Sequence, residues 1–81
     1  MRIRVKLFAI IKERAGVDEL PLDLPAGANV AAVELALKEM FPAIGGFLRQ
    51  CAYAINREYV DAAALLQEGD ELAVIPPVSG G

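Results

Sequence analysis

Hydrophobic and polar residues alternate with a period of two in several short segments of the chain. In residues 2–8 the odd positions hold Ile, Val and Leu, whereas the even positions hold Arg, Arg, Lys and Phe. Such alternation is typical of a strand with one buried face. Residues 19–24 alternate in the same way, with the leucines inward, and stop at a Pro-Ala-Gly sequence. The segments predicted to be strands are residues 2–8, 19–24, 51–55, 59–60 and 71–75.

A helical period replaces the alternation in residues 30–41. Asn29 precedes this segment as a good N-cap, and Pro42 ends it. Glu34 and Lys38 fall on the side opposite the apolar residues, as in an amphipathic helix. The apolar stripe predicted for this helix consists of Val30, Val33, Leu37, Met40 and Phe41.

Three shorter segments complete the predicted elements. Residues 10–15 form a short helical turn, which Gly16 closes in the usual position after a helix. A second helical piece is predicted at residues 44–48. Residues 62–66 are predicted to fill the core as a turn or 3₁₀ piece, before a Gly-Asp turn leads into the last strand.

The predicted elements bury their apolar surfaces if the long helix packs across one face of the sheet. We therefore predict an α+β fold with a mixed four- to five-stranded sheet and one long helix across one face. In this β-grasp (ubiquitin-like) arrangement the first and last strands lie side by side at the centre. Residues 1–75 are expected to form the domain and residues 76–81 an extended C-terminal Gly-Gly tail.

The distribution of charge agrees with adjacent first and last strands. The net charge of the 81-residue chain is −3. Basic side chains dominate residues 1–14 and acidic ones dominate residues 51–81, so the two segments are expected to neutralise each other. A nucleic-acid-binding module is usually clearly basic, so no nucleic-acid partner is expected.

The apolar stretches and the cysteine content indicate where in the cell the protein is expected. The apolar runs are much shorter than the ~20 residues of a membrane helix, so no membrane association is expected. The N-terminal segment is charged too frequently for a signal peptide. One cysteine cannot form a disulfide within the chain, which favours the reducing cytoplasm.

Residues able to form an active site are nearly absent. The chain has no histidine, which excludes Ser-His, Cys-His and His-metal sites. We expect no metal and no bound cofactor. The pair Gly45-Gly46 lacks the other residues of a phosphate loop and is predicted to be a loop before Phe47. Cys51 is predicted to be a packed thiol at the start of a strand, not a reactive one.

The segment after the last strand has a chemistry of its own. Its residues are Pro76, Pro77, Val78, Ser79, Gly80 and Gly81. A terminal carboxylate becomes reactive when ATP-dependent adenylation converts it to a mixed anhydride, which a sulfur nucleophile can attack. Glycine has no Cβ and fits a narrow channel, and proline fixes φ and keeps a tail extended. The alternative is an ordinary frayed chain end.

The chain resembles the small subunits of molybdopterin synthase, the MoaD-type ubiquitin-like sulfur carriers, over essentially all 81 residues. The segments that carry the resemblance are Val5–Ala9 with the following Arg14–Gly16, Ala54–Val60 and Gly69–Gly81. The Pro-Pro-Val-Ser-Gly-Gly sequence is the most specific part, because thiamine-pathway carriers share the terminal Gly-Gly but usually lack the Pro-Pro.

The resemblance implies a function and a set of partners. An E1-like enzyme would consume ATP to adenylate Gly81, and a sulfur donor protein would convert it to a thiocarboxylate. The tail would then enter the large synthase subunit and give sulfur to cyclic pyranopterin monophosphate, forming molybdopterin. Two small and two large subunits would form a heterotetramer, and the catalytic side chains would belong to the large subunit.

Alternation also predicts a docking surface. Phe8 and Ile75 must point away from the helix, and Tyr59 is expected to join them in an apolar patch beside the tail. Grouped exposed apolar residues usually mark an interaction site. The alternative is that Phe8 folds over its own strand edge and Tyr59 is ordinary surface.

Other functions stay open on the sequence alone. The same chemistry serves sulfur carriers for thiamine synthesis or tRNA thiolation, and ubiquitin-like tags that are conjugated to lysines. A plain interaction module with an inactive tail is the remaining possibility.

Overall fold

The computed structural model describes residues 1–77 of the chain. The predictions for Val78, Ser79, Gly80 and Gly81 therefore lie outside the described residues. In chain order, the elements are β1 (Arg2–Leu7), α1 (Ala9–Ala15), β2 (Glu19–Asp23), α2 (Val30–Met40), η1 (Pro42–Ile44), α3 (Gly45–Leu48), β3 (Ala52–Ile55), β4 (Glu58–Val60) and β5 (Glu71–Ile75).

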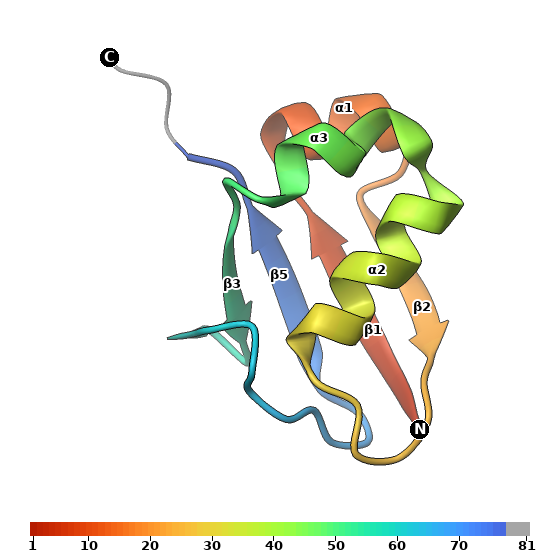
Figure 1. Ribbon diagram of the computed structural model, residues 1–81, viewed down its shortest axis with the longest axis vertical. Helices are drawn as coiled ribbons and strands as arrows, with labels where there is room; N and C mark the ends of the chain where they lie inside the picture. The colour runs from red at the N-terminus through yellow and green to blue at the C-terminus, as the bar shows by residue number, and fades with distance from the viewer. Residues whose placement is uncertain (78–81) are drawn as a thin grey trace.

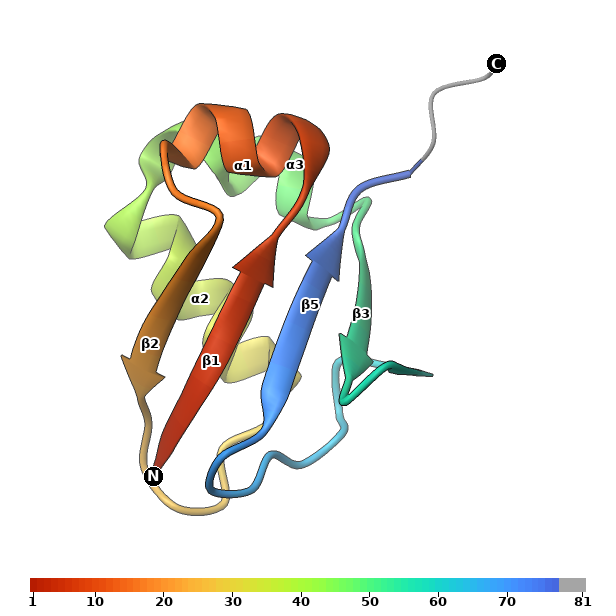
Figure 2. The ribbon, with the colours of Figure 1, turned by 180° about the vertical axis from the view of Figure 1, so that it is seen from behind.

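The strands form one mixed five-stranded sheet in the order β2-β1-β5-β3-β4. β1 and β5 are parallel neighbours, with Leu7 opposite Val74, and the remaining pairs are antiparallel. The helices lie on one side of the sheet in Figure 1, and Figure 2 shows the strands in front of α2 from the other side. The prediction of a β-grasp fold with adjacent first and last strands is confirmed.

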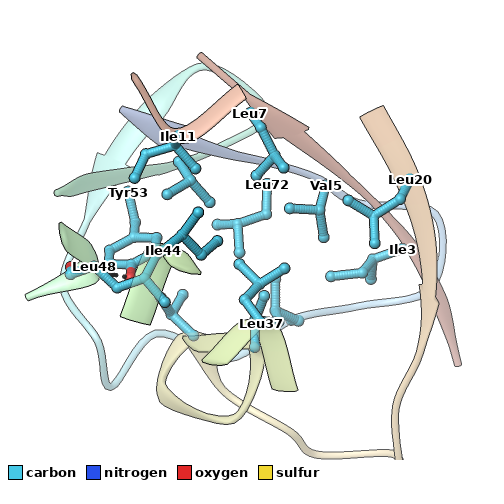
Figure 3. Close-up of a cluster of buried hydrophobic side chains, with 14 residues drawn as sticks. Ile3, Val5, Leu7, Ile11, Leu20, Leu37, Ile44, Leu48, Tyr53 and Leu72 are labelled. Atoms are coloured by element: carbon cyan, nitrogen blue, oxygen red, sulfur yellow. Dashed lines mark hydrogen bonds between the residues drawn. The ribbon is translucent and has the colours of Figure 1, made fainter. Parts of the chain in front are cut away.

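The core lies between the sheet and the helices. Leu37 of α2 is completely buried, and in Figure 3 it points toward the layer that contains Val5 and Leu72. The residues predicted to face the helix from the two central strands are all buried: Ile3, Val5, Leu7, Leu72 and Val74. Because successive side chains of a strand point to opposite faces, the even-numbered residues of β1 and the odd-numbered residues of β5 lie on the face away from the helices.

The ends of the helices follow the sequence signals. The Asn29 side chain accepts a hydrogen bond from the Ala32 N–H (3.0 Å) and caps α2. Gly16 adopts the left-handed conformation (φ 82°) after α1, as glycine commonly does there. Met40 departs from prediction, since it is 47% exposed. Ile44 and Leu48, both completely buried, fill the end of the core instead.

The prediction that segment 62–66 fills the core as a turn is confirmed only in part: Ala62 and Ala63 form a turn, and Ala64 packs against the core. Leu66 is buried, but Leu65 is 67% exposed. The backbone of this segment bonds to the first turn of α2. The carbonyls of Ala62 and Ala64 accept hydrogen bonds from the N–H groups of Ala31 and Val30, respectively (3.0 Å each). These N–H groups have no acceptor within the helix, so the segment satisfies the start of α2.

Two smaller predictions are also corrected. The pair Gly45-Gly46 is not a loop, because it opens the short helix α3 directly after η1. Cys51 does not begin β3, which starts at Ala52. The Cys51 Sγ instead donates a hydrogen bond to the Phe47 carbonyl (3.4 Å), so the thiol stabilises the turn between α3 and β3.

Replacement of Tyr53 by Phe tests the link between the sheet and α2. The buried Tyr53 Oη donates to the Glu34 Oε1 (2.9 Å), and Lys38 Nζ lies 3.8 Å from the other oxygen of that carboxylate. We expect Tyr53→Phe to lower the free energy of unfolding by about 1–2 kcal/mol, because the carboxylate loses a partner. Urea denaturation of both proteins at pH 7 measures this difference.

The pH dependence gives a second check on Tyr53. Burial, then the hydrogen bond to Glu34, raises the pKa of Tyr53. The folded protein therefore keeps the phenol proton above the pH, about 10, at which the unfolded chain loses it. The stabilisation by Tyr53 should be complete below that pH and decline above it. An equal unfolding free energy for both proteins at pH 7 would contradict this assignment.

Candidate docking face and tail

The tail begins at the end of a strand that is held on both sides. β5 pairs with β1 and β3, and Ile75 lies opposite Ala52 as the last pair with β3. Neither Pro76 nor Pro77 has a backbone N–H, so neither can continue the sheet pairing as a donor. Residues 76–77 lead away from the sheet in Figures 1 and 2. The structure therefore starts the tail from a rigid, central position.

The strand register brings distant residues together on the face that the helices leave uncovered. Ala54 of β3 lies opposite both Tyr59 of β4 and Ala73 of β5, and Ala73 lies opposite Lys6 of β1. Their neighbours Tyr53, Leu72 and Val74 are buried on the helix side. The row therefore lies on the outer face across four strands, although Ala54 itself is only 4% exposed.

A hollow of about 300 Å³ lies on this face. We define the outer-face patch as its apolar residues: Phe8, Ala54, Tyr59, Ala73 and Ile75. Phe8 is 43% exposed and Tyr59 is 73% exposed. The structure thus brings Phe8, Tyr59 and Ile75 together on one face beside the start of the tail, where alternation predicted them. Their role in binding a partner stays a prediction.

A sharp turn positions Phe8. Phe8 is extended (φ −127°), and the next residue, Ala9, begins α1 with φ 50°. This left-handed conformation is strained for an alanine, by about 1 kcal/mol. The chain thereby leaves the sheet directly after Phe8. Phe8 also lines a second hollow with Lys12 of α1 and with Asp18 and Glu19 at the start of β2.

Charged residues surround the outer-face patch. Glu71 Oε1 lies 3.5 Å from Arg4 Nη2 and 3.4 Å from Lys6 Nζ. These two ion pairs join β1 to β5 and confirm that the first and last strands neutralise each other. Glu71, Lys6 and Arg57 line the same hollow as the patch.

Sequence reasoning missed five residues of the hollow as site residues: Lys6, Ala54, Arg57, Glu71 and Ala73. For Lys6 and Ala73 a signal was present, since alternation places both outward. Ala54 and Arg57 depend on how β3 and β4 pair with β5, which alternation within one strand does not determine.

Cys51 is a poor nucleophile in this environment. It is half-buried, and burial, then the nearby Glu34 carboxylate, raises the pKa of the thiol. A raised pKa lowers the fraction of reactive thiolate at neutral pH. This agrees with the prediction of a packed thiol.

Residues 1–77 contain neither a cluster of metal ligands nor a helix that could span a membrane. No group of three or more His, Cys, Asp or Glu side chains in that range is placed to hold a metal ion. Within the same residues, every helix is too short or too polar to cross a membrane.

Comparisons with known proteins place the chain in a family. Residues 5–81 match the ThiS family. A molybdopterin synthase sulfur carrier subunit from Chlamydomonas reinhardtii is 40% identical over the full length of both chains. The crystal structure of SAMP1 from Haloferax volcanii has a TM-score of 0.91 and 30% identity, with both chains completely covered.

One similar structure contains two proteins. It is the complex of subunits 1 and 2 of molybdopterin-converting factor from Helicobacter pylori, in which the matching chain has a TM-score of 0.76 and 27% identity, with full coverage of both chains. The family match, the full-length identity and the shared fold agree with the resemblance seen in the sequence. The chain therefore belongs to the ThiS family and is a relative of the molybdopterin synthase sulfur carrier subunits.

Proposed function

We propose that this protein is the sulfur carrier subunit of a molybdopterin synthase and that Gly81 carries the sulfur. The observation that carries the proposal is the 40% identity to a molybdopterin synthase sulfur carrier subunit over the full length of both chains. The fold supports it as well, because the tail follows directly on a central strand, beside an apolar patch in which Phe8 and Tyr59 are exposed.

The proposed chemistry begins at the carboxylate of Gly81. In an E1-like enzyme the carboxylate attacks ATP, pyrophosphate leaves, and an acyl adenylate forms. A persulfide on a sulfur donor protein then displaces AMP and forms an acyl disulfide. A thiol cleaves its S–S bond, so that the thiocarboxylate stays on Gly81 and the thiol and the donor sulfur are left as a disulfide. In the large synthase subunit the thiocarboxylate gives its sulfur to cyclic pyranopterin monophosphate. Water then cleaves the thioester that links Gly81 to the substrate, so the sulfur stays on the pterin and Gly81 returns to a carboxylate for the next cycle.

The chain's own contribution is binding and orientation. The outer-face patch would anchor the large synthase subunit, and the E1-like enzyme would use the same patch at an earlier step. The two partners would then compete, since the patch lies beside the one tail that both must receive. Residues 76–77 would hold the start of the tail extended, which reduces the entropy lost on insertion. Two small and two large subunits would complete a heterotetramer.

A second candidate function is attachment to other proteins. The similarity to SAMP1, named a small archaeal modifier protein in a related structure, favours this candidate. Adenylation of Gly81 is common to both functions, but here a lysine amine would attack the activated glycine and form an amide bond. A sulfur carrier for thiamine synthesis or tRNA thiolation is a further variant of the same chemistry.

Purification of the protein with its bound partner distinguishes these functions. An affinity tag at the N-terminus leaves Gly81 free. Recovery of a large molybdopterin synthase subunit would support the proposal. Recovery of a thiazole synthase alone, or of covalent adducts on lysines without the synthase subunit, would contradict it.

Replacement of Gly80 by Val tests whether the partner enzymes hold the tail in a narrow channel. A branched Cβ restricts the backbone and adds bulk where the partner enzymes are expected to surround the tail closely. We expect Gly80→Val to block adenylation or sulfur transfer while the melting temperature changes little, because the core cluster of the described residues lies within residues 3–74. Pyrophosphate release measures adenylation, and Gly80→Ala serves as a milder control. Normal activity of Gly80→Val would show that the channel is wide.

A further inference from the structure

Arg57 lies at the tip of the β3–β4 hairpin in a backbone conformation that favours glycine. Ile55 pairs with Glu58, so Asn56 and Arg57 alone form the turn. Their φ angles are 49° and 73°. Two-residue turns of this kind prefer Asn-Gly, because a residue with a Cβ is strained in the left-handed region. Asn56 fits this preference, whereas Arg57 does not.

The neighbouring Asn56 fixes the position of this strained turn. Its Nδ2 donates to Asp70 Oδ1 (2.9 Å), and its Oδ1 accepts from the Glu71 N–H (3.0 Å). Its own N–H donates to the Glu71 carbonyl (2.8 Å). The hairpin tip is therefore tied to the start of β5, and the backbone of Arg57 is held at a constant place beside the hollow.

Arg57 differs from the other cations on this face. Arg4 and Lys6 share the carboxylate of Glu71. Across residues 1–77, no carboxylate lies within ion-pair distance of Arg57, and this residue is exposed. The uncovered sheet face thus presents one guanidinium whose charge is not balanced by a neighbour in the described part of the chain.

The hollow beside Arg57 is apolar at one end and charged at the other. Along β5 the outward residues are Glu71, Ala73 and Ile75 in order. Glu71 and Arg57 therefore lie near one end, and Ile75 lies toward the tail. Ala73 and its partner Ala54 have small side chains and form the floor between these ends.

We propose that the protein docked on the outer-face patch inserts an apolar side chain over Ala73 and places a carboxylate against Arg57. This inference rests on the proposed function, because the docked protein is taken to be the large synthase subunit. A guanidinium binds a carboxylate through two parallel hydrogen bonds, and the apolar contacts around such a pair strengthen it. A partner with a cation at this place is repelled, so Arg57 contributes specificity.

Arg57→Gly is expected to weaken binding of the large synthase subunit without destabilising the fold. Glycine suits the turn, so the melting temperature should be unchanged or higher. Calorimetry with the large synthase subunit from the same organism should show about tenfold weaker binding, since a hydrogen bond to a charged group is lost. The salt dependence of binding should also become smaller. Arg57→Lys should restore part of the affinity, because the charge is kept.

Arg49→Gln is the matched control for this experiment. Arg49 is exposed and follows α3, so its replacement removes the same charge outside the hollow. Affinity close to that of the unaltered chain in Arg49→Gln, with the loss confined to Arg57→Gly, supports the inference. Equal losses in both variants would show general charge attraction and overturn it.

Ala73→Leu tests the apolar half of the hollow. Leucine at this outward position fills the space above Ala54, while the strand keeps its pairing on both sides. We expect a loss of affinity of at least tenfold with an intact fold. Unchanged affinity in both Ala73→Leu and Arg57→Gly would overturn the inference while the proposed function stands. Absence of binding by the unaltered chain would overturn both.

Discussion

Deletion of Gly81 is expected to abolish sulfur transfer. In the proposed mechanism the activated and sulfur-bearing atom is the carboxyl carbon of Gly81, so its removal shifts the carboxylate one residue back, to Gly80. The shortened tail would no longer reach the reacting centre, where a displacement of about 1 Å can already cost 100-fold in rate. The fold should be unaffected, because the buried core cluster runs from Ile3 to Val74. The measurement is molybdopterin formation in a reconstituted reaction, together with a thermal melt.

Cys51→Ser is the matched control for that deletion, because Cys51 is the only cysteine in the chain. Its thiol is half-buried, has a raised pKa and donates to the Phe47 carbonyl (3.4 Å). We expect Cys51→Ser to keep sulfur transfer, with at most a small loss of stability. Loss of transfer in Cys51→Ser, with retained transfer after the deletion, would contradict the carboxylate mechanism.

Replacement of Phe8 or Ile75 by Ala is expected to weaken binding to the large synthase subunit about 30-fold. Both side chains line the hollow on the uncovered sheet face, next to the start of the tail. Truncation of an apolar anchor at the centre of an interface typically costs ~2 kcal/mol or more, which is a factor of ~30 in affinity. Phe8 is 43% exposed, so its loss should affect the fold much less than it affects binding. Calorimetric binding and a thermal melt of each variant provide the comparison.

Leu35→Ala is the control for the docking face. Leu35 is 61% exposed and lies on α2, on the side of the sheet opposite the outer-face patch. Its truncation removes a similar apolar surface and should leave the affinity unchanged. Unchanged affinity in both Phe8→Ala and Ile75→Ala, with weaker binding by Leu35→Ala, would place the docking surface on the helix side.

The sequence was sufficient to predict the faces of the sheet. Alternation in β1 and β5 places Ile3, Val5 and Leu72 inward, and all three are completely buried. The order of the central strands followed from charge, since Arg4 and Lys6 on one strand face Glu71 on the other. The placement of Phe8 and Ile75 on one outer face followed from these two predictions together.

Some features could not be predicted, because neither the charge distribution nor the alternation within one strand shows them. The segment 62–66 is rich in Ala and Leu, which suggests a position in the core. Its carbonyls also accept hydrogen bonds from the N–H groups of Val30 and Ala31. Side-chain patterns do not show backbone hydrogen bonds of this kind. The hollow likewise depends on the pairing of Ala54 with Ala73, which lie on strands far apart in sequence. The left-handed φ of Arg57 depends on the two-residue turn that the pairing of Ile55 with Glu58 leaves.

In the proposed mechanism the sulfur is carried on the carboxyl group of Gly81. The most direct measurement is mass spectrometry of the peptides from protein incubated with ATP, the E1-like enzyme and the sulfur donor. We predict that the peptide ending in Gly81 gains the mass difference between a sulfur and an oxygen atom, and that this gain requires ATP. A mass gain of one sulfur atom on the peptide containing Cys51, with an unchanged C-terminal peptide, would contradict the account.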